Sequence, residues 1–258
     1  MNRKPIPAGF ITASLLVALF IALPLLVTLL SSTPGALGQT LSDPEVARSI
    51  GLTFGAGGIA AGLGLLGGVP LAYLLARFKF PGKRALQALV DLPVVIPHTA
   101  AGVALLMVFG RQGLLGRPLS GLGLVLTDSL AGIVAAMMFV SLPYLVNASR
   151  DAFALVDEEM ERVALIDGAS AWQAFWLVTL PQAWRGVAGG ALMMWARGIS
   201  EFGAVVILAY HPKIVPVLVY ERFEGFGLKA ALPVAVLLIL AAVIVFGLLR
   251  WLLTPERD

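Results

Sequence analysis

The segment AGFITASLLVALFIALPLLVTLL, residues 8–30, is long and apolar and contains no ionisable side chain. A helix needs about 20 such residues to cross the hydrocarbon core of a bilayer. Two basic residues, Arg3 and Lys4, precede the segment, as basic residues precede the apolar core of a secretory signal peptide. That core is only about 7–15 residues long, so we expect residues 8–30 to form a retained transmembrane helix.

The composition of the whole chain also favours lipid as its surroundings. Of the 258 residues, 59% are hydrophobic and 13% are charged, whereas soluble proteins have about 45–50% apolar and about 25% charged residues. So few charges could not keep a compact chain of this length dispersed in water. The net charge of +3 is small, and the basic residues cluster at the ends of the apolar segments, which argues against a nucleic-acid partner.

Five further segments are long and apolar enough to cross a membrane. They are residues 49–76, 85–110, 129–149, 186–210 and 230–249. Pro93 and Pro97 each remove a backbone donor from the third span, and Pro233 breaks the sixth span near its start. The sequence therefore predicts an all-α membrane protein with six transmembrane helices.

The basic residues predict the orientation of these spans. With the N-terminus inside the cell, eleven Lys and Arg residues lie on the cytoplasmic side, six lie outside and Arg197 lies within a span. Residues 77–84, RFKFPGKR, contribute most of this bias. Since Lys and Arg concentrate in cytoplasmic loops, we expect a multi-pass protein of the cytoplasmic membrane with both termini in the cytoplasm.

These spans divide the chain into three parts. We expect a first helix and outer loop over residues 1–48, a transmembrane domain over residues 49–250 and a short cytoplasmic tail over residues 251–258. The glycines of the second span favour close helix packing, with a gating hinge as the alternative. These are Gly55, Gly57, Gly58, Gly62, Gly64, Gly67 and Gly68.

The connection between the fourth and fifth spans is structured rather than a simple loop. It contains the acidic run at residues 157–159, an amphipathic stretch from Glu161 to Phe175, and Leu180-Pro181. We expect a short helix that lies on the cytoplasmic surface. The spacing is Arg162-Val163-Ala164, three residues, Gly168, nine residues and then Val178-Thr179-Leu180-Pro181.

This spacing resembles the EAA loop of ABC importer permeases, Glu-Ala-Ala-x3-Gly-x9-Ile-x-Leu-Pro. The glycine permits a sharp turn between two short helices, and an amphipathic helix of this kind can lie in an apolar groove. The resemblance implies that the groove belongs to an ATPase subunit. It implies coupling roles for Glu161, Arg162, Ala164, Gly168, Ala169, Ser170, Trp172, Gln173 and Phe175.

Two features of this segment leave alternatives open. Arg162 and Val163 replace the Glu and Ala of the motif, and Glu161 stands one residue early, so the ion pair that the family assigns to the motif glutamate is uncertain in this chain. The alternative to the whole interpretation is an amphipathic interfacial helix that binds no partner.

Two other stretches resemble the third and fifth spans of molybdate/tungstate permeases, most strongly those of the archaeal type. They are DLPVVIPHTAAGVALL at residues 91–106, followed by Phe109-Gly110, and WARGISEFGA at residues 195–204, followed by Tyr210-His211-Pro212 and Tyr220-Glu221-Arg222. The similarity covers about residues 50–250. Sulfate permeases have related helices, so a permease for sulfate or another oxyanion is an alternative, and a secondary transporter is a second alternative of another class.

The resemblance implies a permease subunit of an ATP-driven importer of a tetrahedral oxyanion, tungstate or molybdate. Such a subunit works as a homodimer in membrane lipid, with two cytoplasmic ATPase subunits. An extracytoplasmic binding protein would deliver the anion to the outer loops at residues 111–128 and 211–229. The resemblance gives no enzymatic role to this chain.

No catalytic, cofactor or metal site is predicted in this chain. No stretch fits the phosphate-binding pattern GxxxxGK[ST], so we expect ATP and Mg to be bound by the partner ATPase. The chain has no cysteine, and its two histidines, His98 and His211, are too far apart in sequence for an HExxH zinc site.

Ionisable residues within spans mark the predicted translocation pathway. Arg197 and Glu201 are four residues apart, so they share a helix face, either as an internal packing pair or as a cation beside the anion path. His98 and Thr99 follow the break at Pro97 and either offer donors to an anion or bond to neighbouring helices. The predicted pathway set is Pro97, His98, Thr99, Arg197, Ser200 and Glu201. For Asp91 we expect snorkelling or a pair with the nearby basic cluster rather than a transport role.

Overall fold

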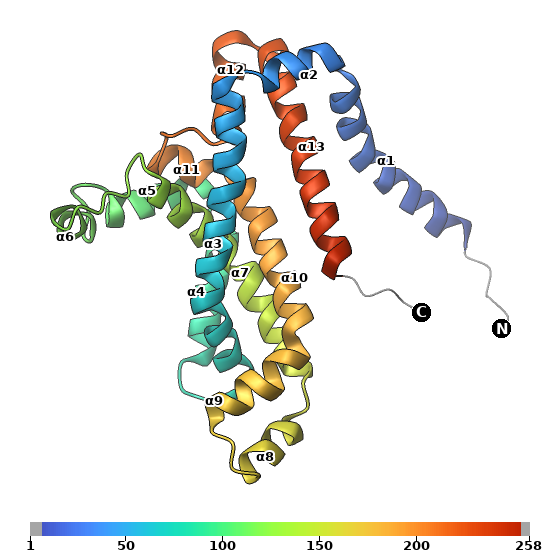
Figure 1. The fold of residues 1–258 in the computed structure, drawn as a ribbon. Helices are drawn as coiled ribbons and strands as arrows, with labels where there is room; N and C mark the ends of the chain where they lie inside the picture. The colour runs from blue at the N-terminus through green and yellow to red at the C-terminus, as the bar shows by residue number, and fades with distance from the viewer. Residues whose placement is uncertain (1–6, 254–258) are drawn as a thin grey trace.

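A computed structural model describes residues 7–253, and it is helical without a β-strand in that range (Figure 1). Its helices are α1 Ala8–Leu30, α2 Pro34–Leu41, α3 Pro44–Arg77, α4 Lys83–Val95, α5 His98–Phe109, α6 Gly116–Gly121, α7 Leu130–Leu155, α8 Glu158–Ile166, α9 Ala171–Ala174, the π-helical turn η1 Phe175–Thr179, α10 Leu180–Ile199, α11 Gly203–Leu208, α12 Val215–Phe226 and α13 Leu228–Leu253. Arg3, Lys4 and most of the predicted tail at residues 251–258 lie outside the described residues.

Four of the predicted spans are confirmed as long apolar helices. These are α1, α3, α7 and α13, each long and apolar enough to cross a membrane. Helix α3 begins at Pro44 because Asp43 caps it by accepting a hydrogen bond from the Glu45 amide at 2.9 Å, so the predicted domain boundary at residue 48 falls inside this helix. The expected break at Pro233 is wrong, since α13 is continuous through it.

The third span, predicted over residues 85–110 with interruptions at Pro93 and Pro97, forms two helices in the structure. Helices α4 and α5 meet at a bend of 116°. The residue before a proline is driven toward extended backbone, and Ile96 has that conformation (φ −75°, ψ 144°) immediately before Pro97. Pro93, by contrast, is accommodated within α4. Pro97 rather than Pro93 therefore sets the bend.

The predicted fifth span, residues 186–210, is also wrong as a single helix. Helix α10 begins six residues earlier, at Leu180, and ends at Ile199. A turn at residues 200–202 separates it from the short helix α11. A carboxylate oxygen of Glu201 accepts the Ala204 amide at 2.8 Å, which satisfies a free donor in the first turn of α11. Arg197 therefore lies in the last turn of α10 rather than in mid-helix.

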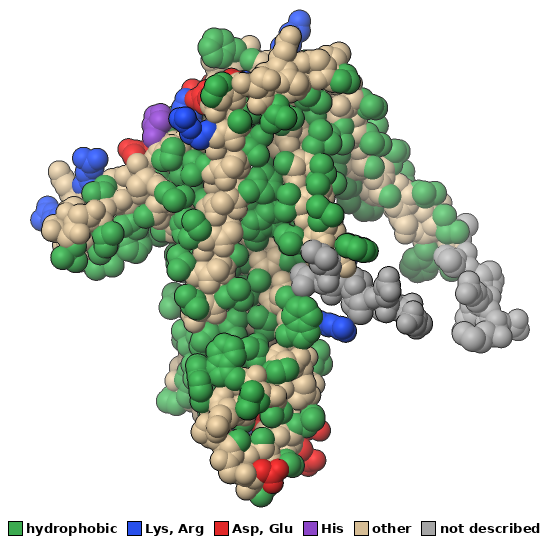
Figure 2. All heavy atoms as spheres, viewed as in Figure 1, with side chains coloured by type: hydrophobic (Ala, Val, Ile, Leu, Met, Phe, Trp, Pro, Cys, Tyr) green, Lys and Arg blue, Asp and Glu red, His purple; other side chains and the backbone are tan. Residues whose placement is uncertain are grey.

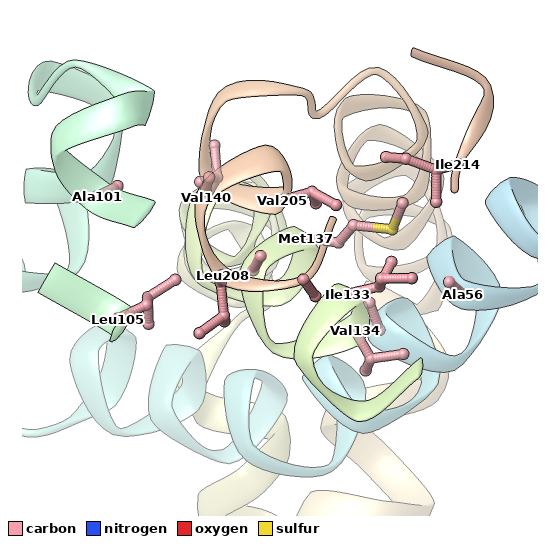
Figure 3. Close-up of a cluster of buried hydrophobic side chains, with 14 of the residues drawn as sticks. Ala56, Ala101, Leu105, Ile133, Val134, Met137, Val140, Val205, Leu208 and Ile214 are labelled. Atoms are coloured by element: carbon pink, nitrogen blue, oxygen red, sulfur yellow. The ribbon is translucent and has the colours of Figure 1, made fainter. Parts of the chain in front are cut away.

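The core of the bundle lies where α3, α7 and α10 pack together, with α11 against α5. Figure 3 shows buried side chains that α3, α5, α7 and α11 bring together, including Ala56, Leu105, Met137 and Leu208. Helix α1 stands apart from this core and touches α13 only slightly. Figure 2 shows apolar side chains over the middle of the bundle and charged ones gathered near its two ends, a surface that suits a bilayer.

The glycines of α3 divide into two groups. A Cβ on Gly57, Gly64 or Gly68 would lie within 2.5–3.1 Å of side chains on α10 or α7, so close packing, as predicted, explains these three. The other four predicted glycines face open space in the single chain: Gly55, Gly58, Gly62 and Gly67.

Candidate coupling segment and translocation pathway

A tight turn at Gly168 joins α8 to α9. The Gly168 amide donates to Leu165 O at 3.2 Å and the Ala169 amide donates to Ala164 O at 2.9 Å, the two bonds of a Schellman C-cap. This cap requires a left-handed residue after the helix, and Gly168 has φ +93°. The motif glycine is therefore explained by backbone geometry.

Helix α9 begins with a capping box. The Gln173 amide donates to Ser170 Oγ at 3.2 Å, and the Ser170 amide donates to Gln173 Oε1 at 2.8 Å. Because the two motif residues satisfy each other, they fix the direction in which α9 leaves the turn. The local hydrogen bonds thus define a rigid α8–turn–α9 unit, which we call the coupling segment (residues 158–174).

Glu161 forms an ion pair within the chain. Its Oε1 accepts Arg77 Nε at 3.1 Å, and Tyr73 Oη and Thr179 Oγ1 also donate to the carboxylate. Arg77 also donates to Val156 O at 2.8 Å. The side chains of Arg77 and Glu161 are only 7% and 13% exposed. The Arg77–Glu161 ion pair therefore joins α8 to α3 almost out of contact with solvent, and the hydrogen bond from Thr179 joins α8 to η1. Arg162, at the motif position, instead forms an exposed ion pair with Glu158.

The coupling segment leaves several large apolar side chains on its surface. Ile166 is 84% exposed and Trp172 is 66% exposed. Phe175, which the sequence groups with them, is buried among Tyr73, Phe153 and Trp172. The ring of Phe175 therefore anchors η1 to the bundle, and its coupling role stays a prediction.

The predicted pathway residues lie together at the break between α4 and α5. His98 Nδ1 lies 2.9 Å from Glu201 Oε2, and Arg197 Nη2 donates to the same oxygen at 2.9 Å. Arg197 also lies 2.7 Å from His98 Nδ1. Glu201 is fully buried, Arg197 is 19% exposed and His98 is 38% exposed. We call these three side chains the His98–Arg197–Glu201 cluster.

Two exposed hydroxyl residues, Thr99 and Ser200, are close to this cluster in sequence, as is Pro97, which is also exposed. Ser200 Oγ accepts Arg197 Nη1 at 3.2 Å and donates to Arg197 O at 2.9 Å. A guanidinium and an exposed threonine hydroxyl are donors suited to an oxyanion, since an anion accepts hydrogen bonds on every oxygen. The carboxylate beneath them limits the net positive charge.

Two glycines bring α5 and α11 close enough to form the cluster. A Cβ on Gly203 would lie 2.9 Å from the Cβ of His98, and a Cβ on Gly102 would lie 2.8 Å from the Cβ of Ile207. Asp91 takes no part, and the expected pair with the basic cluster is not formed, because its carboxylate accepts Asn147 Nδ2 at 2.6 Å.

Residues 68–254 match the protein family described as the binding-protein-dependent transport system inner membrane component. The chain belongs to this family. The match runs from the middle of α3 through α13 and includes both the coupling segment and the His98–Arg197–Glu201 cluster.

Curated relatives of this permease carry specific names. A molybdate/tungstate transport system permease protein from Thermococcus kodakarensis is 46% identical, with 90% of each chain covered. One from Pyrococcus furiosus is 45% identical over 93% of this chain and 92% of the relative. A probable sulfate transport system permease from Zygnema circumcarinatum is 31% identical over 85% of this chain and 78% of the relative. The predicted resemblance to the molybdate/tungstate permeases is confirmed.

Solved structures confirm the fold of the permease. A bacterial alginate ABC transporter chain superposes with a TM-score of 0.71 at 16% identity, covering 95% of this chain and 91% of that one. A chain of a methionine ABC transporter in inward-facing conformations gives a TM-score of 0.64 at 17% identity, covering 82% and 95%.

The structure also shows functional candidates of the permease that the sequence alone did not indicate. The carboxylate of Glu161 accepts hydrogen bonds from Arg77, Tyr73 and Thr179. In the sequence, Arg77 served only as one of the cytoplasmic positive charges that predict the membrane orientation. A basic residue at the end of a span can set the membrane orientation or form an ion pair, and the sequence does not distinguish the two. Only the fold shows that Arg77 reaches Glu161 on α8.

A second group ties α12 to the start of α3. Lys213 Nζ donates to Glu221 at 2.7 Å and to Glu45 at 3.1 Å, and Arg222 donates to Asp43 at 2.5 Å. The Lys213 ammonium lowers the pKa of Glu221, and the Arg222 guanidinium lowers the pKa of Asp43. We call these five residues the α3–α12 ion-pair network.

Proposed function

We propose that this permease is the membrane subunit of an ATP-driven importer that carries molybdate or tungstate across the cytoplasmic membrane. The observation that carries the proposal is the identity of 40–46%, over about nine-tenths of each chain, with four archaeal proteins named as molybdate/tungstate transport permeases. Such similarity along the whole length includes both candidate sites.

The proposed membrane arrangement has six crossings. The bent pair α4–α5 supplies the third, and α10 supplies the fifth. Helix α10 has 20 residues, and a helix of that length spans about 30 Å, the thickness of the hydrocarbon core. It carries two charged residues, Arg185 and Arg197, and Arg197 turns toward Glu201 inside the bundle. Both termini then lie in the cytoplasm.

The coupling segment is proposed to dock on a cytoplasmic ATPase subunit, which binds ATP and Mg. Support comes from the exposed Ile166 and Trp172 on a segment whose backbone is fixed by two capping motifs. A rigid amphipathic helix is suited to an apolar groove. The buried Arg77–Glu161 pair gives a mechanical link by which movement of the segment reaches α3.

The His98–Arg197–Glu201 cluster is proposed to line the anion path. Arg197 supplies positive potential, the exposed Thr99 supplies a hydroxyl donor, and Ser200 holds the Arg197 guanidinium by accepting Nη1 at 3.2 Å. Glu201 offsets the charge of Arg197, so an anion is attracted without being held. Weak binding along a path is a requirement of conduction.

Further subunits complete the proposed importer. A second copy of the permease would form a homodimer around the path, and the open glycines Gly55, Gly58 and Gly62 of α3 offer a surface for close helix contact. An extracytoplasmic binding protein would deliver the anion near residues 111–128 and 211–229.

The test is ATP-dependent uptake into proteoliposomes that contain the permease, its ATPase and its binding protein. Uptake of labelled molybdate that excess tungstate blocks and excess sulfate leaves unchanged supports the proposal. The sulfate relatives make sulfate the second candidate, and equal inhibition by sulfate would select it. Uptake that needs no ATP would reject the importer class in favour of a secondary transporter.

A further inference from the structure

The turn between α3 and α4 presents basic side chains that have no acidic partner. Among the described residues, Lys79, Lys83 and Arg84 form no ion pair, and Lys83 only donates to Phe78 O at 3.1 Å. Lys79 and Arg84 are exposed. Arg77, which precedes them, is by contrast fully engaged with Glu161 and Val156.

These cations border an open hollow. It has a volume of about 680 Å³ and is lined by Lys79, Phe80, Gly82, Lys83, Arg84, Ala85 and Gln87. Its volume is within the roughly 300–1,000 Å³ of small-molecule sites. Gly82 has φ +86° and turns the chain so that residues on both sides of it reach the same hollow. Phe80 packs against the core and holds the turn in place.

An apolar surface continues from this hollow along α4. Leu86 and Val90 pack on the bundle core, whereas Ala85 lies on another face of the helix with Leu89 and Leu92, at positions i+4 and i+7. Leu89 is 63% exposed and Leu92 is 48% exposed. Positive charge at one end and exposed leucines beyond it form the pattern of an interfacial lipid site, with the head group at the cations and acyl chains along the helix.

We propose that the α3–α4 turn binds the head group of an anionic phospholipid, with Lys79, Lys83 and Arg84 contacting its phosphate. Under the proposed orientation this lipid lies in the cytoplasmic leaflet, which carries the negative surface potential. The site is independent of the transported anion, because it lies on α3 and α4 away from the His98–Arg197–Glu201 cluster.

Native mass spectrometry of the detergent-solubilised permease, titrated with phosphatidylglycerol or phosphatidylcholine, tests this site. Lys79→Gln/Arg84→Gln changes two exposed side chains without partners, so it should leave the fold intact. Each basic side chain near an anionic lipid surface contributes about fivefold to affinity, so we expect affinity for phosphatidylglycerol to fall about 25-fold, with affinity for phosphatidylcholine unchanged.

The matched control removes the same charge elsewhere. Arg48→Gln/Arg117→Gln replaces two exposed residues near the opposite end of the spans and should keep the preference for phosphatidylglycerol. An equal loss in both variants would overturn the site, since net charge alone would then explain binding. Displacement of phosphatidylglycerol by equimolar inorganic phosphate would reassign the hollow to a free anion. Unchanged affinity of Lys79→Gln/Arg84→Gln for phosphatidylglycerol would also overturn the site.

Discussion

The carboxylate of Glu201 is fully buried and faces both Arg197 and His98. Removing one partner of a buried ion pair leaves the other charge without compensation, at a cost of about 3–5 kcal/mol. Since Arg197 is partly exposed, we expect Glu201→Gln to lower the free energy of unfolding by about 3 kcal/mol, at the low end of that range. Denaturant unfolding in detergent measures the change.

A double variant separates pairing from packing. Arg197→Gln/Glu201→Gln removes both charges and should recover part of the stability lost by Glu201→Gln alone. A loss equal to the sum of the two single losses would show that the two side chains contribute independently, and the ion-pair explanation would be wrong.

The α3–α12 ion-pair network predicts a pH dependence. In the folded protein Arg222 lowers the pKa of Asp43, and Lys213 lowers the pKa of Glu221. The two ionised carboxylates therefore stabilise the folded state fully at any pH above their unfolded pKa values of about 4. This stabilisation is lost as the pH falls through their lower, folded-state pKa values. Acidification from pH 6 to pH 3 should therefore lower the unfolding midpoint. In the variant Arg222→Gln/Lys213→Gln, acidification should lower the unfolding midpoint by less. An equal decrease in the variant and the parent protein would show that other carboxylates cause the pH dependence.

At the scale of elements, the coupling segment depends on the left-handed backbone of Gly168. A side chain at this position finds open space but adopts a left-handed conformation that costs about 1–2 kcal/mol. We expect Gly168→Asp to leave the permease inserted and to reduce ATP-dependent uptake more than tenfold, because strain and the added carboxylate both disturb docking. Asp167→Asn, at the preceding exposed C-cap, should keep normal uptake, and normal uptake by Gly168→Asp would reject the coupling role.

The contact between α5 and α11 sets the position of the His98–Arg197–Glu201 cluster. A Cβ on Gly102 would lie 3.0 Å from the backbone of Ala204, which has no flexible end that can move away. Overpacking of this kind costs about 1–3 kcal/mol, so Gly102→Val should lower the unfolding midpoint and impair uptake. Gly67→Val, on an open face of α3, should keep the midpoint, and a similar loss in both variants would point to helix propensity instead.

The sequence predicted spans best where hydropathy alone decides them. Apolar runs located α1, α3, α7 and α13, because a bilayer demands only length and low charge. The break of the third span at Pro97 was predicted from the proline itself, whereas the fifth span failed as a single helix, since local backbone at Glu201 decides where α10 ends. Such breaks are tolerated in a membrane only where other groups satisfy the freed backbone, and those groups come from distant parts of the chain.

In the candidate sites too, the sequence predicted features that depend on neighbouring residues and missed those that depend on distant parts of the chain. The spacing of the motif located Gly168 and Ser170, whose roles depend on neighbours in sequence. Arg77 and Thr179 were missed as partners of Glu161 because folding brings them together from different helices. The burial of Phe175 could not be predicted for the same reason, since periodicity gives a face of a helix but not what covers it.

At the scale of the whole molecule, the orientation in the membrane can be tested with single cysteines, because the chain has none of its own. Ile166 on α8 is 84% exposed and Leu114 before α6 is 80% exposed. Only α7 crosses between them, so they should lie on opposite sides. We expect a membrane-impermeant maleimide to label Leu114→Cys from outside intact cells and Ile166→Cys only in inverted vesicles.

A third cysteine tests whether α1 faces lipid. Phe20 is 80% exposed in the single chain and lies in the middle of an uncharged span, so Phe20→Cys should react from neither side until detergent is added. Labelling of Ile166→Cys from outside would invert the topology and place the coupling segment where no cytoplasmic ATPase can reach it. Labelling of Leu114→Cys and Ile166→Cys from one side would mean that α7 does not cross, and the arrangement of six spans would fail with it.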